Sequence, residues 1–111
     1  MSTPTQRLAE LGLTLPPVAK PLAAYTPAIT VGNQVWVSGQ LPLRDGKLVA
    51  TGRLGDAVEP AEGAEAAKVA ALNALAAVAD QAGGLDNVAR ILKAVVFVAS
   101  TTDFTAQPQV A

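Results

Sequence analysis

The fold is decided by residues 28–42, which read AITVGNQVWVSGQLP. Two runs rich in β-branched residues, 28–31 and 34–38, lie on either side of the pair Gly32-Asn33. This pair tolerates the positive φ angles of a two-residue hairpin turn, and the second run alternates apolar and polar side chains. The stretch therefore predicts two antiparallel strands joined by a tight turn.

Further strands are expected on both sides of a central helix. Asp45-Gly46 favours another tight turn, which returns the chain through residues 47–49 as a third strand of an antiparallel meander. Residues 91–99 are nearly all apolar and β-branched apart from Lys93. Such a run is typical of a strand that is buried on both faces and paired inside a sheet.

Helix signals occur before and after these strands. Thr3 can cap a short helix that has Pro4 at its first position and Gly12 at its end. The longest helix is expected to open at Glu59-Pro60 and to close at Gly83-Gly84. Its apolar face is predicted from a recurrence at every third residue, at Val69, Leu72, Leu75 and Val78.

Composition excludes several kinds of chemistry. The 111 residues are enough for one domain and include no histidine and no cysteine. The chain therefore has no imidazole base, no His-paired nucleophile, no disulfide and no metal site built from thiolate or imidazole. With a formal net charge of -1, the chain lacks the excess of basic residues that is typical of nucleic-acid binding. Small molecules or proteins are the expected partners.

The first eleven residues carry Arg7 and Glu10 and contain no unbroken hydrophobic run. They fit neither a signal peptide nor a membrane span. We therefore expect a cytoplasmic protein without a membrane partner.

Ser38-Gly39-Gln40, at the end of an apolar strand, is the most interesting candidate for a binding segment. Glycine lets a ligand approach the backbone, whose N–H can bind a carboxylate or carbonyl oxygen together with the Ser38 hydroxyl. On the residues alone, a strand that ends in a bulge with Ser38 bonding locally is the favoured interpretation.

The other candidates are aromatic or cationic. Tyr25 is the only tyrosine and can wall a pocket, although a packing role is equally consistent with its position, and Phe104 invites the same comparison. Arg44, Arg53 and Arg90 are the cations able to clamp an anionic substrate, but nothing in their spacing requires it.

Several of these segments occur in one characteristic order, with the long alanine-rich helix between them. They are Tyr25-Thr26-Pro27-Ala28, Val31-Gly32-Asn33, Val37-Ser38-Gly39-Gln40-Leu41-Pro42, and Val96-Phe97-Val98 followed by Asp103-Phe104. In this order and spacing, the chain resembles the reactive intermediate deaminase family, also called the YjgF/YER057c/UK114 or L-PSP family.

The resemblance implies a chorismate-mutase-like α+β fold, in which a mixed sheet packs on helices. It also implies a homotrimer whose ligand clefts lie between adjacent subunits. The implied activity is that of a 2-iminobutanoate/2-iminopropanoate deaminase. Such an enzyme hydrolyses reactive enamines or imines, such as 2-aminoacrylate, to 2-oxo acids and ammonia. No organic cofactor and no metal is implied.

Residue by residue, Tyr25, Ser38 and Phe104 match the pocket positions of that family, and Gly39 would add backbone contacts. The arginine that would bind the substrate carboxylate, and a later glutamate, belong to C-terminal strands with no matching segment here. We therefore expect residues 1–111 to form a single domain that lacks the C-terminal helix and strands, and no catalytic residue is assigned. The alternative is a non-catalytic trimeric module that binds small carboxylates or proteins.

Overall fold

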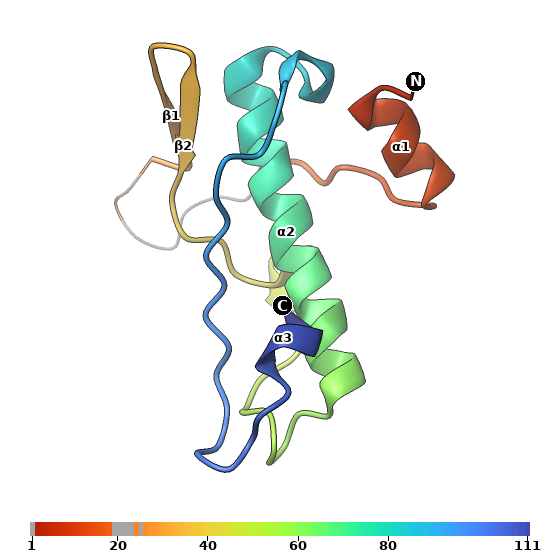
Figure 1. Cartoon of the computed structure of the whole chain (residues 1–111), viewed down its shortest axis with the longest axis vertical. Coiled ribbons are helices and arrows are strands. Elements are labelled where there is room, and N and C mark those ends of the chain that lie inside the picture. Colours follow the sequence, from red (N-terminus) through yellow and green to blue (C-terminus); the bar gives the residue numbers. More distant parts are fainter. Residues whose placement is uncertain (1, 19–23, 25) are drawn as a thin grey trace.

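One long helix runs through most of the molecule, and the other elements pack along it (Figure 1). The computed structural model describes residues 2–18, 24 and 26–111. In chain order the elements are α1 (Pro4–Glu10), β1 (Ala28–Val31), β2 (Gln34–Val37), β3 (Leu43–Arg44), β4 (Lys47–Leu48), α2 (Pro60–Ala82), the 3-10 helix η1 (Leu85–Asn87) and α3 (Gln107–Val110). The chain is thus α+β, as the sequence predicts.

The first hairpin forms as predicted. β1 and β2 pair antiparallel, with Ala28 opposite Val37 and Val31 opposite Gln34. Gly32 has a φ of +60°, so this glycine supplies the left-handed conformation that a two-residue hairpin turn needs at its first central position.

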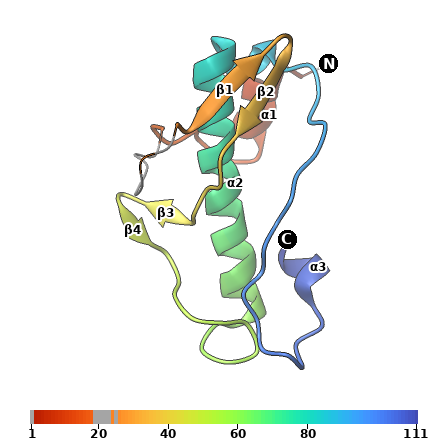
Figure 2. The ribbon, with the colours of Figure 1, turned by 90° about the vertical axis from the view of Figure 1, so that its left-hand side faces the viewer.

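The second hairpin corrects the expected meander of three strands. β3 and β4 pair with each other around Asp45 and Gly46, whose φ angles are +54° and +77°, and form a separate two-stranded sheet (Figure 2). The chain between β2 and β3 is instead hydrogen-bonded to α2. There the Asn73 side-chain amide donates to the carbonyls of Leu41 and Leu43, at 3.0 and 2.9 Å. The turn was predicted correctly, but the sheet order was wrong.

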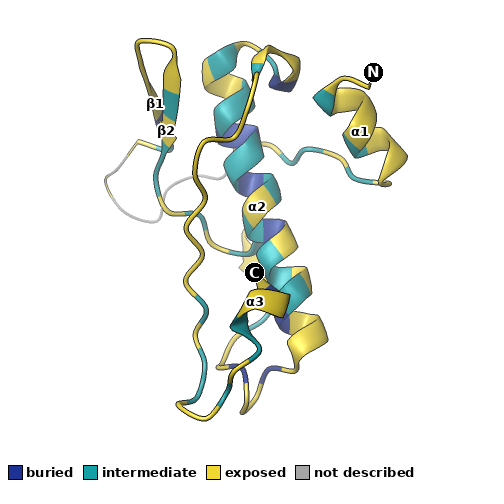
Figure 3. Cartoon of the chain, viewed as in Figure 1, coloured by how far each residue is buried: buried dark blue, intermediate teal, exposed yellow. Residues whose placement is uncertain are grey.

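The expectation of a buried strand at residues 91–99 is also wrong for the described structure. The segment is extended and runs beside α2, but its backbone enters no ladder before the bridge between Leu54 and Ser100 (Figure 1). Its apolar side chains are largely exposed, with Phe97 at 94% (Figure 3). An extended run becomes a strand only when a neighbour satisfies its N–H and C=O groups. Within this run, only the Ala99 carbonyl has such a backbone partner among the described residues, the Leu54 N–H.

α2 buries one face that consists mainly of small residues: Gly63, Val69, Asn73, Ala76 and Ala77 (Figure 3). The predicted recurrence at every third residue matches this face only at Val69, because a helix repeats every 3.6 residues and a strict three-residue pattern drifts around it. At the N-terminal end of α2, a second cluster consists of Leu54, Val58 and Val110, with Val98 and Phe104 against it.

The termini of the helices follow the predicted signals. α1 has a capping box between Thr3 and Gln6, and α2 starts at Pro60 and ends at Gly83 with a φ of +75°. α1 is tied to η1 by a 2.8 Å hydrogen bond from the Thr5 backbone N–H to the Asp86 carboxylate. Short as it is, α1 is thereby attached to η1, which follows α2 in the chain.

This tie is expected to depend on pH. Hydrogen bonds from the Thr5 side chain and then from its backbone N–H lower the pKa of Asp86 below its usual value. A lowered pKa means that the contribution to stability is present above the ordinary carboxyl pKa and is lost as the pH falls through the lowered one. The protection factor of the Thr5 amide, which is its exchange rate relative to an unstructured amide at the same pH, should therefore fall on acidification. Asp86→Asn, which keeps an oxygen acceptor but does not titrate, should remove this pH dependence; unchanged acid sensitivity in that variant would contradict the assignment.

Candidate functional site

The strand end at Ser38 is held by one carbonyl. Both the backbone N–H and the hydroxyl of Ser38 donate to the Pro27 carbonyl oxygen, each at 3.0 Å. The local bonding favoured for Ser38 from its residue type is therefore present. Because the hydroxyl proton is engaged, the Ser38 oxygen presents its lone pairs as an acceptor.

Gly39 is exposed, and a Cβ built on it would meet no atom within 4 Å. Its φ lies outside the left-handed range in which glycine is favoured. Neither crowding within the described chain nor backbone conformation therefore requires a glycine here. The backbone beside the Ser38 oxygen is open to close approach from outside.

Phe104 lies in a different part of the molecule. It is half-buried against Leu54, Val58 and Val110, and its Cβ would be 3.3 Å from a Cβ built on Gly55. Its described contacts are those of a packing residue. Tyr25, the remaining predicted pocket residue, lies outside the described residues.

The predicted site residues are thus not gathered into one pocket by the described contacts. The contacts of Ser38 go to Pro27, whereas those of Phe104 go to the cluster near α3. A site that includes both would have to be completed by another segment or another copy of the chain, as the resemblance implies.

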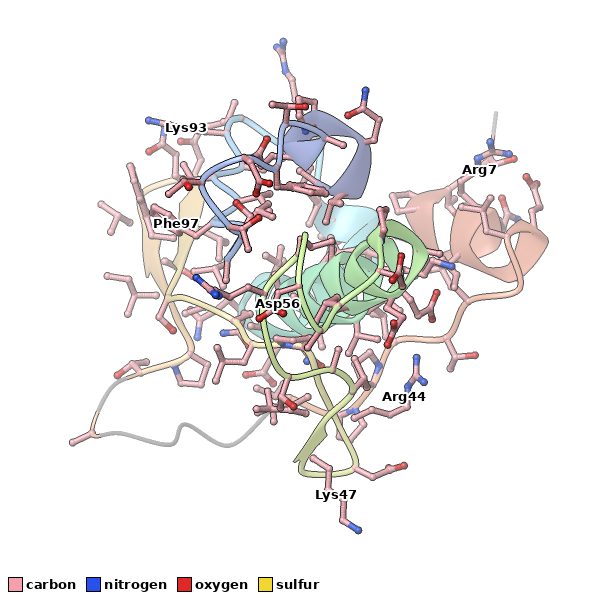
Figure 4. All side chains as sticks on the ribbon, turned by 90° about the horizontal axis from the view of Figure 1, so that it is seen from below. Arg7, Arg44, Lys47, Asp56, Lys93 and Phe97 are labelled. Atoms are coloured by element: carbon pink, nitrogen blue, oxygen red, sulfur yellow. The ribbon has the colours of Figure 1, made fainter. Side chains whose placement is uncertain are left out.

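One surface hollow, of about 360 Å³, is lined by Arg44, Val49, Ala61, Glu62 and Glu65. Glu65, one of its two carboxylates, is paired with two cations, at 3.3 Å from Arg44 and 3.2 Å from Lys68. A hydrogen bond from Lys68, supported by its charge and by Arg44, lowers the pKa of Glu65. An exposed, paired carboxylate with a lowered pKa is a poor general base. Arg44, whose side chain is labelled in Figure 4, is the ion-pair partner of Glu65.

A second hollow, of about 280 Å³, lies between α1 and the end of α2. It is lined by Pro4, Arg7, Leu8, Leu75, Leu85, Val88, Ala89, Arg90 and Ile91. Sequence reasoning did not find this hollow, because its walls come from segments that are far apart in the chain. Leu8, an apolar residue of the short first helix, is half-buried there.

Two kinds of feature are missing from the part of the chain that the structure describes. No set of three acidic side chains gathers there to hold a metal ion. None of its helices has both the length and the apolar character needed to cross a membrane.

Comparison with known proteins adds a family. Residues 5–106 match the model described as "YjgF/chorismate mutase-like, putative endoribonuclease". A curated relative is Protein TCP17 of Trypanosoma cruzi, which is 40% identical over 104 residues. That match takes in 94% of this chain and 65% of TCP17.

Two solved structures share the fold. The protein Atu1372 of Agrobacterium tumefaciens, described as having unknown function, aligns with a TM-score of 0.80 and 42% identity. A Shewanella oneidensis protein described as a "putative endoribonuclease" aligns with a TM-score of 0.84 and 34% identity. The matches cover 94% and 98% of this chain, but 62% and 72% of those proteins. The chain therefore spans less than two thirds of TCP17 and of Atu1372.

Proposed function

Because the chain belongs to the YjgF/chorismate mutase-like family, we propose that it acts in the hydrolysis of reactive enamines and imines. The substrates would be small 2-imino acids, such as those formed from 2-aminoacrylate, and the products a 2-oxo acid and ammonia. The observation that supports this proposal is the backbone of Gly39, which has free space around it and lies next to the Ser38 hydroxyl oxygen, an available acceptor. Both lie in the segment that is most specific to the family resemblance.

The chemistry demands little of the protein. The carbon of a protonated imine is already electrophilic, so water adds to it, the C–N bond breaks, and ammonia leaves as a carbonyl forms. Positioning the substrate and one water can then provide much of the acceleration. In this proposal the Gly39 N–H donates to the substrate carboxylate, and the Ser38 oxygen accepts from the imine N–H. The absence of histidine and cysteine is compatible with this reaction.

Gly39→Val should separate function from folding. The valine side chain would enter open space, so the free energy of unfolding should change little, whereas the approach of a ligand to the backbone would be blocked. We expect release of 2-oxo acid from freshly generated 2-aminoacrylate to fall by about tenfold or more, a loss of ~1.4 kcal/mol in transition-state stabilisation. Urea unfolding of the same variant is the control. Full turnover in Gly39→Val would refute the assigned cleft, and no turnover in the native protein would refute the activity.

We further propose that the protein works as a homotrimer with clefts between subunits. This is supported by an uncovered apolar face on the first hairpin. Ile29 and Trp36 lie directly opposite each other in the ladder, and they are 52% and 61% exposed. Adjacent apolar side chains that remain this exposed are typical of a surface that another protein covers.

The assembly is expected to depend on that face. Light scattering should give the mass of a trimer for the native protein, and Trp36→Lys should give smaller species, because a charge would have to be buried in the interface. Lys47→Gln, on the separate β3–β4 hairpin, is the control and should remain trimeric. A stable monomer of the native protein would contradict the proposal.

A non-catalytic module that binds small carboxylates or proteins is the alternative. Saturable binding of 2-oxobutyrate without turnover of any imine would favour it. The family and the Shewanella protein are both described as a "putative endoribonuclease", so RNA cleavage is a further candidate activity. The charge of this chain gives it little support, because four of the eight basic residues, Arg7, Arg44, Arg53 and Lys68, are within ion-pair distance of carboxylates.

A further inference from the structure

The hollow between α1 and α2 is lined mainly by apolar side chains. Leu8 faces it from α1, Leu75 from α2, and Leu85 and Ile91 from the chain after α2. The hydrogen bond from the Thr5 N–H to Asp86 joins the two sides at 2.8 Å. This bond attaches α1, which is only seven residues long, to η1 beside the hollow.

The charged side chains that line this hollow are both basic. Its two charged lining residues are Arg7 and Arg90, and no carboxylate is among the described residues that line it. The Arg7 guanidinium lies 2.9 Å from Glu10 and is largely neutralised. Arg90 is exposed and is in no ion pair with the described residues. One uncompensated cation therefore stands beside an apolar surface.

We propose that this hollow binds a free medium-chain aliphatic carboxylate. The alkyl chain would lie against Leu8, Leu75 and Leu85, and the carboxylate would accept hydrogen bonds from the Arg90 guanidinium. The hollow has a volume of about 280 Å³, near the lower limit of about 300 Å³ for small-ligand pockets, which suits a short alkyl chain. This site is separate from Ser38 and Gly39, so the proposal does not depend on the deaminase function.

Octanoate is the probe that tests both halves of the proposal. Titration of the native protein should produce saturable methyl chemical-shift changes at Leu8, Leu75 and Leu85. Octanol, which has the same chain without the charge, should bind more weakly. Arg90→Gln should weaken octanoate binding by about three- to tenfold, as expected for losing a charge-assisted hydrogen bond at an exposed rim, and it should leave octanol binding unchanged.

Two control variants test whether octanoate binds in this hollow. Lys93→Gln removes an exposed cation three residues away that does not line the hollow, and it should leave octanoate binding unchanged. Ala89→Phe should fill the hollow and abolish binding of both probes, while circular dichroism reports that the helices remain folded. Figure 4 shows Lys93 and Arg7 on different sides of the molecule.

Several outcomes would overturn the proposal. These are non-saturable binding, equal affinity for octanol and octanoate, unchanged octanoate affinity in Arg90→Gln, and shifts confined to residues 91–97. Self-association that is disrupted by Ala89→Phe would instead make the hollow an interface between copies of the chain. None of these outcomes bears on release of 2-oxo acid, which tests the proposed function separately.

Discussion

Leu54→Ala is expected to lower the free energy of unfolding by about 2–5 kcal/mol, the range for truncating a buried leucine. Leu54 is only 5% exposed and forms the centre of the cluster that joins Val58 to Val110. The substitution leaves its backbone bonds to Ala99 and Thr101 possible, because these use only the N–H and C=O groups. The loss should therefore come from the cavity and from the missing apolar contacts. Urea unfolding measures it.

Leu48→Ala is the matched control for this prediction. Leu48 is 46% exposed on the β3–β4 hairpin, so the same chemical change should alter stability by less than about 1 kcal/mol. Equal losses in the two variants would show that the Leu54 cluster is not formed.

Gly63 provides an independent check on the same contact. A Cβ on Gly63 would lie 2.8 Å from Leu54 Cδ2 and 3.2 Å from Val110 Cγ1, so Gly63→Ala should crowd the cluster. In the Leu54→Ala background that space is free, and the better helix propensity of alanine should then be realised. A double-mutant cycle should show the two substitutions together to be less destabilising than their sum.

Asn73→Ala is expected to cause the second large loss of stability, about 1–3 kcal/mol. Asn73 is 3% exposed and donates to the carbonyls of both Leu41 and Leu43. Its removal would take the amide donor from both oxygens, although the Leu41 oxygen would keep the Leu43 N–H at 2.8 Å. Leaving a buried hydrogen-bonding group without its partner costs about 1–3 kcal/mol. The connection after Gly39 would lose its attachment to α2, so 2-oxo acid release should also fall if the proposed cleft is correct.

Gln81→Ala separates this effect from the general loss of an amide on α2. Gln81 is exposed and accepts a 2.7 Å hydrogen bond from the Thr30 hydroxyl, so its removal should change stability by less than about 0.5 kcal/mol. If Asn73→Ala were as mild as Gln81→Ala, water would be replacing the amide and Asn73 would not anchor the connection.

Local signals explain what could be predicted of the fold. Caps and turns act within a few residues, so Thr3, Pro60 and Gly83 mark the helix termini, and Gly32 and Asp45-Gly46 mark the hairpins. The sheet order depends on contacts between distant segments. The predicted sheet order is wrong because Asn73, a polar residue within an apolar pattern, donates hydrogen bonds to two carbonyls in the segment that follows β2.

The same distinction applies to the candidate site. The local bonding of Ser38 follows from residue type and position, since a serine at a strand end readily bonds a nearby carbonyl. The free space around Gly39 depends on the absence of described atoms from other segments nearby, and a local sequence pattern cannot predict that. The hollow beside Arg90 was missed because residues 4–8, 75 and 85–91 form it together.

In the proposed assembly, the extended run at residues 91–97 would link the lifetime of the protein to its association with partner chains. Proteases bind their substrates as extended chains, and exposed, unpaired segments are where cleavage concentrates. Phe97, 94% exposed within such a run, is therefore a natural point of attack on an isolated chain. A partner that pairs with this backbone shields it at the same time, so unassembled copies would be degraded selectively while assembled copies persist.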